Sequence, residues 1–373
     1  MKRASFLLFS TLFAYTLSAQ MWNGRDSIFG NEWIKEGQSY YKINIATDGV
    51  FRITGATLRT LGVPISSVTG SQFQLFKNGE EVTIFTSSNG NFADNDFVEF
   101  YGQYNRSEVD VHLFKNGLKD LLNPEYSLIT DTAAYFLTWS TTPSVKRYQS
   151  TINDLTNLPS KDAWYWHTSN QVFKSASIKN GLNSSNDVYL CEYNSGEGYG
   201  TAMQREQSFT ISPQNAVTSV NGQLTVRYAG NTSAHINHLT LNTDTVRIDT
   251  NFTYTDFVRT LTASVDGAKL SSNLTFKIRG AFNNLDLNTV SNISLKYARP
   301  FNFNNTNYFE FEVSASNDRK YVEIDNFRAS SVAPILLDVT NNLRIATTLQ
   351  GSTVRVVLPP SVTNRKLVLV SAA

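Results

Sequence analysis

LTFKIR, residues 274–279, is a strict alternation of apolar and polar side chains. Because successive side chains of a β-strand point to opposite faces, this order turns Leu274, Phe276 and Ile278 toward a core and their neighbours toward water. The same alternation recurs in residues 224–228, 293–297 and 309–313. The pattern predicts antiparallel strands with one wet face, and therefore an all-β fold.

Asparagine–glycine pairs supply turns between such strands, because both residue types tolerate positive φ. They occur at Asn78-Gly79, Asn89-Gly90, Asn116-Gly117, Asn180-Gly181 and Asn221-Gly222. The clearest predicted hairpin runs through residues 73–76, turns at Asn78-Gly79 and returns through residues 82–85.

Helical periodicity is scarce. Its best example is Gly55 to Leu61, where Leu58 and Leu61 are three residues apart and Gly62 can take the left-handed terminating position. No repeat of fixed period is visible, which disfavours a solenoid or a propeller.

The composition excludes several classes of protein. With 373 residues the chain is long enough for two or three domains. Its 32 Lys and Arg against 31 Asp and Glu give a net charge of +1, so no overall field favours nucleic acid as a partner. A single cysteine excludes a disulfide framework and a cysteine-rich zinc site.

The first 20 residues have the order of a secretory signal peptide. Lys2 and Arg3 precede the apolar run 4–17, and Ser18-Ala19 follows as a small-residue cleavage site. The run is shorter than the roughly 20 residues that span a bilayer. We therefore expect residues 1–19 to be removed and the mature chain, with no membrane span, to reach the periplasm, the outer-membrane surface or the outside.

Two breaks divide the remaining chain. Residues 149–161 are polar, lack alternation and contain Pro159, and a second break falls near residues 330–334. We expect two antiparallel β-sandwich or jelly-roll-like domains at residues 20–155 and 160–330, followed by a short β-rich tail at residues 331–373. The tail is apolar at residues 353–358 and 366–370, and we expect a further domain to cover it.

The candidate nucleophile is Cys191, which the alternation places between Tyr189 and Tyr193 on one face of a strand. The adjacent Glu192 would raise the pKa of its thiol, so a half-buried structural cysteine is the favoured interpretation. The four histidines are His112, His167, His235 and His238. On a strand the His235-x-x-His238 spacing puts the two imidazoles on opposite faces, which does not favour a shared metal.

Two further clusters have structural explanations. Asp94, Asp96 and Glu99 lack the glycine of a calcium loop and fit a capped turn before a strand at residues 97–101. The glycine-rich residues 195–200 are followed by no amphipathic helix that could bind phosphate, and they fit a tight turn or bulge. We therefore assign no catalytic, cofactor-binding or metal-ligating residue.

Trp164 and Trp166 leave two interpretations open. Flat aromatic rings can stack on sugars, so the pair could bind a glycan in a secreted β-rich protein. Large aromatic side chains also dominate sheet interiors, which favours core packing.

Six segments, in this order, resemble one known family. They are SYYKINIATDGVFRIT (39–54), FQLFKNGEEVTIF (73–85), DNDFVEFYGQYN (94–105), YSLITDTAAYFLTW (126–139), EYNSGEGYGTAMQREQSF (192–209) and KYVEIDNF (320–327). They look like the N-terminal region of gingipain-like cysteine peptidases of Bacteroidetes, a family that includes PorU-like sortases of the type IX secretion system. The resemblance covers about residues 38–373.

The resemblance implies a non-catalytic role for this chain. In the family a peptidase domain follows these β domains and carries a His-Gly and a Cys-Gly dyad, but here no histidine precedes glycine and Cys191 precedes Glu192. We expect an accessory region or pro-region that helps a peptidase domain to fold, restrains it or docks it. Its partners would be the peptidase domain of the same polypeptide or components of the secretion system. The alternatives are a cell-surface glycan-binding or adhesion module using Trp164 and Trp166, and a free-standing enzyme using Cys191.

Overall fold

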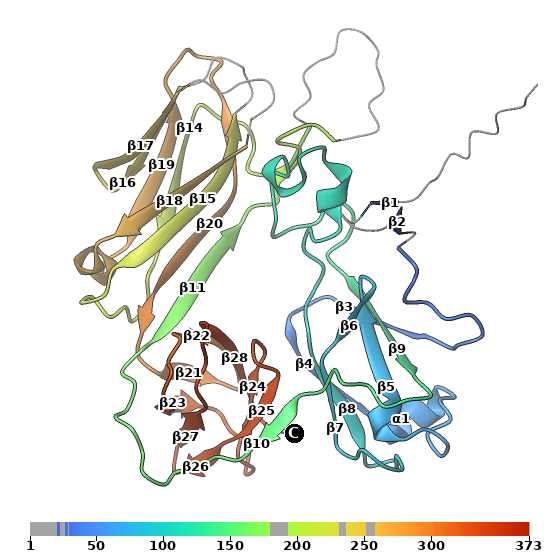
Figure 1. Cartoon of the computed structure of the whole chain (residues 1–373). Coiled ribbons are helices and arrows are strands. Elements are labelled where there is room, and N and C mark those ends of the chain that lie inside the picture. The colour runs from blue at the N-terminus through green and yellow to red at the C-terminus, as the bar shows by residue number, and fades with distance from the viewer. Residues whose placement is uncertain are drawn as a thin grey trace, which may run out of the picture.

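A computed structural model describes residues 21–22, 27–28, 30–179, 193–230, 236–250 and 258–372 (Figure 1). The predicted signal peptide, Cys191 and His235 lie outside the described residues. Within them the protein is mostly β, with several antiparallel sheets arranged as open sandwiches, as the alternation predicts. No described helix is long and apolar enough to cross a membrane.

The first β unit packs two sheets around one core. One sheet has the order β3 (Tyr41–Ile45), β9 (Ala133–Trp139), β5 (Phe73–Lys77) and β6 (Glu80–Val82), and the other has β4 (Gly49–Thr54), β8 (Phe97–Gly102) and β7 (Ile84–Thr86). Side chains such as Phe73, Phe100 and Tyr135 fill the space between them. Two short strands, β1 (Met21–Trp22) and β2 (Ser27–Ile28), pair with each other before this unit.

The predicted hairpin and helix are both present. Leu75 pairs with Val82, and the turn residues Asn78 and Gly79 both have positive φ. The returning chain then leaves the sheet, because β7 pairs with β8 instead. Helix α1 spans Gly55–Thr60 and ends before Gly62, whose φ is +84°. A single 3-10 turn, η1 (Gly70–Gln72), precedes β5.

Between β8 and β9 the chain makes a long excursion, residues 103–131, that reaches the second β unit. It contains the 3-10 turns η2 (Asp110–Leu113) and η3 (Gly117–Lys119). Leu122 packs with Ala229 and Val258 of the second unit and with Ile178 of β12. The small sheet of β12 (Ala176–Ile178) and β13 (Gly198–Gly200) lies beside this contact, since Leu122 donates its amide to the carbonyl of Glu197.

The second unit is a sandwich of two antiparallel layers. One layer contains β11 (Tyr165–Val172), β20 (Asn288–Arg299), β15 (Gly222–Gly230) and β18 (Val258–Val265); the other contains β14 (Glu206–Ile211), β19 (Leu274–Gly280), β16 (Ile236–Leu241) and β17 (Asp244–Thr250). Leu274, Phe276 and Ile278 are fully buried, which confirms the prediction that the apolar side chains of LTFKIR point toward a core. The 3-10 turn η4 (Gly267–Ser271) follows β18.

The third unit is a second sandwich, and one of its layers belongs to the same nine-stranded sheet as the β11–β20–β15–β18 layer of the second unit. The strands of its first layer follow β11 in the order β22 (Tyr308–Val313), β28 (Arg365–Val370), β24 (Ile335–Asp338), β25 (Leu343–Ala346) and β10 (Gln149–Thr151). The strands of its second layer are β21 (Asn302–Thr306), β23 (Lys320–Phe327), β27 (Thr353–Leu358) and β26 (Thr348–Gln350). Two pairs, β10 with β25 and β21 with β23, are parallel. The nine-stranded sheet thus links both sandwiches, and β11 and β20 lead from one toward the other (Figure 1).

The expectation that residues 366–370 need a further domain to cover them is wrong. Strand β28 lies between β22 and β24, so both of its edges are paired. Leu367, Val368 and Leu369 are completely buried by this chain's own residues. Residues 335–370 complete the same core as Phe303 and Ile324, because the strands of the supposed tail supply both layers of the third unit.

Candidate functional site

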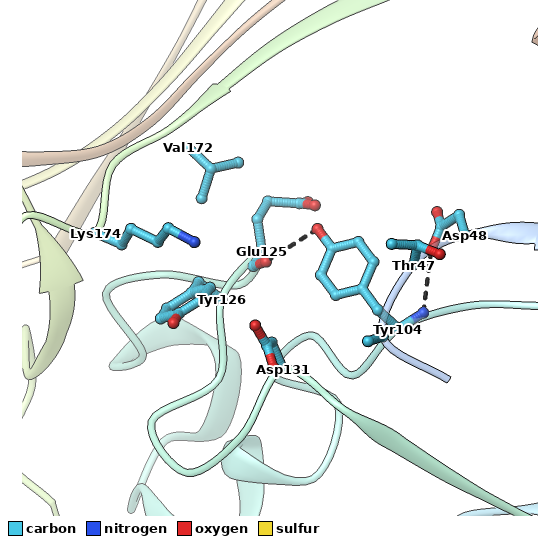
Figure 2. Close-up of a pocket in the computed structure, with 9 residues that line it drawn as sticks. Thr47, Asp48, Tyr104, Glu125, Tyr126, Asp131, Val172 and Lys174 are labelled. Carbon is cyan, nitrogen blue, oxygen red and sulfur yellow. Dashed lines mark hydrogen bonds between the residues drawn. The ribbon is translucent and has the colours of Figure 1, made fainter. Parts of the chain in front are cut away.

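A cleft of about 430 Å³ lies where the first unit, its excursion and the end of β11 meet. Three segments line it: the turn after β3, the two ends of the excursion and the residues around the end of β11 (Figure 2). The described lining residues are Ala46, Thr47, Asp48, Tyr104, Glu125, Tyr126, Asp131, Val172 and Lys174. Its size falls in the usual range of small-molecule pockets.

An ion-pair network holds one wall of this cleft. Arg106 contacts Asp48 with both terminal nitrogens, at 2.7 and 3.3 Å, and its Nε lies 3.2 Å from Glu125 Oε2. The amide of Tyr104 donates to Asp48 Oδ1 at 3.1 Å. Burial acts to lower the pKa of Arg106, but the hydrogen bond and charge of Asp48 outweigh it, so the pKa is raised. The guanidinium is therefore a fixed cation that ties the β3–β4 turn to the excursion.

Tyrosine rings form the other walls. The Tyr104 hydroxyl points to the carbonyl of Glu125 at 3.4 Å, and burial raises the pKa of this phenol (Figure 2). The Lys174 ammonium lies 4.9 Å from the centroid of the Tyr126 ring. The nine lining residues named above include no serine, cysteine or histidine. These lining residues offer polar and aromatic contacts to a ligand and include no Ser–His or Cys–His pair.

The three histidines in the described part of the chain lie on three separate elements. His112 on η2 and His238 on β16 are exposed, and His167 on β11 is half-buried. In the described part of the chain no three His, Cys, Asp or Glu residues stand close enough to hold a metal ion.

The acidic segment forms a capped turn, as predicted. Asp96 accepts from the amide of Ala93 at 2.8 Å and from the hydroxyl of Ser87. Asp94 instead pairs with Arg59 on helix α1. Glu99 points the other way, into the protein, where its side chain is 3% exposed.

Trp164 and Trp166 lie side by side and are both half-buried. Their ring centroids are 4.9 Å apart and their planes cross at 75°, so the two rings do not form one flat surface. Trp166 donates from Nε1 to Ser314 Oγ at 3.1 Å. It also lines a hollow of about 280 Å³ together with Glu310, Glu312, Lys366 and their neighbours.

Sequence reasoning missed a polar cluster that fastens the first unit to the third. Tyr101 on β8 donates to Glu310 Oε1 at 2.8 Å and accepts from Lys366 Nζ at 2.6 Å. Tyr308 donates to the same carboxylate oxygen. Burial, followed by the charge of Glu310, raises the pKa of Tyr101. No local pattern could reveal this cluster, because its members are partners only after the distant strands have paired.

Comparison with solved structures identifies a likeness of fold. A crystal structure of dimeric latent PorU from Porphyromonas gingivalis matches 90% of this chain with a TM-score of 0.55 and 12% sequence identity. This chain spans about a third of that structure, 32% of its length. At this identity the likeness shows that the two share a fold over the matched region.

Other matches are much weaker. A CBM36-1 domain of a multidomain xylanase from the hindgut metagenome of Trinervitermes trinervoides covers 35% of this chain and 96% of its own, with 12% identity and a TM-score of 0.21. A family 35 carbohydrate-binding module from Clostridium thermocellum covers 34% of this chain and 97% of its own, with 17% identity and a TM-score of 0.20. These scores are too low to carry an argument. No family model and no curated protein matches the sequence.

Proposed function

We propose that this chain is the non-catalytic accessory region of a gingipain-like cysteine peptidase of the type IX secretion system, comparable to the part of PorU that it resembles. The match to latent PorU over 90% of the chain carries the proposal, and the six ordered segments of sequence support it.

Among folding, restraint and docking, the contacts between the units favour a rigid support. The Tyr101–Glu310–Lys366 cluster fixes the first unit on the third, and Arg106 fixes the excursion on the β3–β4 turn. A support of this kind would hold a peptidase domain, or a component of the secretion machinery, at a defined distance and angle. Export through the predicted signal peptide forms part of this proposal.

The test begins with the gene. A reading frame that continues beyond Ala373 into a domain with His-Gly and Cys-Gly supports the proposal, and a stop codon there, confirmed on the transcript, contradicts it. In the longer protein, deletion of residues 38–373 should abolish accumulation of folded peptidase or its delivery to the cell surface. Normal folding and delivery of the deleted protein would refute the supporting role. N-terminal sequencing of exported protein tests cleavage after Ala19.

A second candidate function, glycan binding, is favoured by one observation. Trp166 opens onto a hollow that also presents two carboxylates and a lysine, groups that can exchange hydrogen bonds with sugar hydroxyls. Glycan-array binding by the purified chain should disappear in Trp166→Ala and weaken in Trp164→Ala. Trp33→Ala, which removes a half-buried tryptophan of the first unit, is the matched control and should leave binding unchanged. Binding that persists in both variants would exclude this site.

A further inference from the structure

Arg299 is a buried cation without an ion-pair partner among the described residues. It is the last residue of β20, at the junction between the cores of the second and third units, and only 4% of its surface is exposed. Neither its Nε nor its Nη2 has a hydrogen-bond acceptor, and it forms no ion pair within the described residues. Burying a charge without a partner is among the costliest arrangements in a protein, so a missing acceptor is expected.

A second orphaned donor lies on the neighbouring strand. Tyr165 on β11 is the cross-strand partner of Arg299 in the ladder with β20, so both side chains project from the same face of the sheet. The Tyr165 ring is 1% exposed, and its hydroxyl likewise has no hydrogen-bond partner. Three unused donor atoms therefore belong to one directly opposed pair of residues.

The described neighbours of this pair are aromatic rings and an imidazole. The next pair on the same face of the ladder is His167 with Tyr297, and Phe301 and Phe303 pack against the Tyr165 ring. Burial lowers the pKa of His167, which leaves the imidazole neutral at pH 7. The surroundings are thus aromatic, with one fixed positive charge.

We propose that Arg299 and Tyr165 bind a small monovalent anion, of the halide class, between the two sandwich cores. Burial to 4% exposure favours a small free ion over the bulkier carboxylate of another protein. Guanidinium is weakly hydrated and suits an acceptor in an aromatic setting. The ion would neutralise the buried charge and join β11 to β20 where the second unit meets the third.

Thermal unfolding of the whole chain tests this inference. Sodium chloride or bromide replaces sodium gluconate at constant ionic strength, and the unfolding midpoint should rise with the logarithm of the halide concentration, by about 3 °C when the halide is at about 100 times its dissociation constant. The rise should vanish in Arg299→Met and shrink in Tyr165→Phe. Arg328→Met removes an exposed arginine of the third unit and should keep the full rise. A rise of equal size in Arg299→Met would overturn the proposal.

Crystals of the unaltered protein grown in bromide give a second measurement that does not depend on the stability of a variant. An anomalous peak within hydrogen-bond distance of the Arg299 guanidinium and the Tyr165 hydroxyl is the expected result. A water molecule at that position, or an Arg299 side chain that turns out to solvent, would show that the charge is satisfied without an anion.

Discussion

Glu99 on β8 accepts a hydrogen bond from Arg344 Nε on β25 at 3.0 Å, although the two residues belong to different β units. Arg52 on β4 binds the other carboxylate oxygen at 2.7 Å. The Glu99 side chain is 3% exposed, whereas the two arginines are 29% and 20% exposed. One buried carboxylate thus balances two cations and joins the first unit to the third.

Glu99→Gln should destabilise the fold strongly. The substitution keeps the shape but removes the negative charge, which leaves Arg52 and Arg344 next to each other without a counter-charge. Loss of one partner of a buried ion pair costs about 3 to 5 kcal/mol. Chemical denaturation measures the change in free energy of unfolding. Asp94→Asn, which breaks the exposed pair with Arg59, is the control and should cost about 0.5 kcal/mol or less.

Arg227→Met should release the excursion from the second unit. Arg227 Nε donates to the carbonyls of Leu121 and Leu122 at 3.0 and 3.1 Å, and Nη1 donates to Thr260 Oγ1. Without these bonds the carbonyls lose their partners inside a mostly buried contact. Hydrogen exchange should show protection of residues 117–122 falling by about tenfold or more, which corresponds to one lost charged hydrogen bond.

The Arg227 experiment has a control on the same sandwich. Arg279→Met removes an exposed arginine of β19, whose side chain is 57% exposed, and should leave exchange at residues 117–122 unchanged. Equal protection in the Arg227 variant and the unaltered protein would mean that the apolar contact of Leu122 is sufficient to hold the excursion.

Local patterns of sequence predicted the strands, the side of each strand that is buried, and the turns, but not which strands pair with each other. The alternation at Leu274 and Phe276 fixes which side is buried, and Asn78-Gly79 fixes a hairpin, because both effects act within a few residues. Strand β28 has the same kind of pattern, yet its position between β22 and β24 depends on distant segments. Its apolar residues therefore suggested a missing cover where the chain supplies its own.

The candidate cleft was beyond prediction for the same physical reason. Asp48, Tyr104 and Lys174 come from three separate segments, and each has an ordinary local setting. Only the docking of the excursion brings them together. Trp166 could be named from the sequence because a tryptophan in a β-rich protein with a predicted signal peptide is a candidate sugar-binding residue by its type alone. The other residues of its hollow include side chains of β22 and β28, which are distant in the sequence and could not be predicted.

Gly70→Ala should be poorly tolerated. A Cβ at Gly70 would lie 1.7 Å from the carbonyl oxygen of Ser88, which is backbone and cannot swing aside. The amide of Gly70 also donates to the carbonyl of Gly90 at 2.8 Å, so the two segments cannot separate without losing a hydrogen bond. We expect a loss of about 3 kcal/mol in the free energy of unfolding, typical of a severe overpacking.

The control for this substitution is its hydrogen-bond partner. A Cβ at Gly90 would meet no atom within 4 Å, so Gly90→Ala should change the free energy of unfolding by about 0.5 kcal/mol or less. Similar stabilities of the two variants would mean that the loop carrying Ser88 moves away at little cost.

His167 should make stability depend on pH in the acidic range. Burial, followed by the positive charge of Arg299, lowers the pKa of His167 to about 4 from an ordinary value of 6.5. Between pH 6.5 and 4 the unfolded chain binds a proton that the folded chain does not, so the free energy of unfolding decreases as the pH falls through this window. The pKa difference corresponds to about 3 kcal/mol.

Chemical denaturation at pH 6.5 and 4.5, in buffer without halide, measures this contribution. His167→Asn cannot take up the proton in either state, so its loss of stability on acidification should be smaller than that of the unaltered protein by most of this amount. His238→Asn is the matched control, because the exposed imidazole on β16 should not alter the slope. If both variants lose as much stability as the unaltered protein, His167 is protonated in the folded state at pH 4.5, and its ring is then not shielded from water by the core around Tyr297 and Phe309.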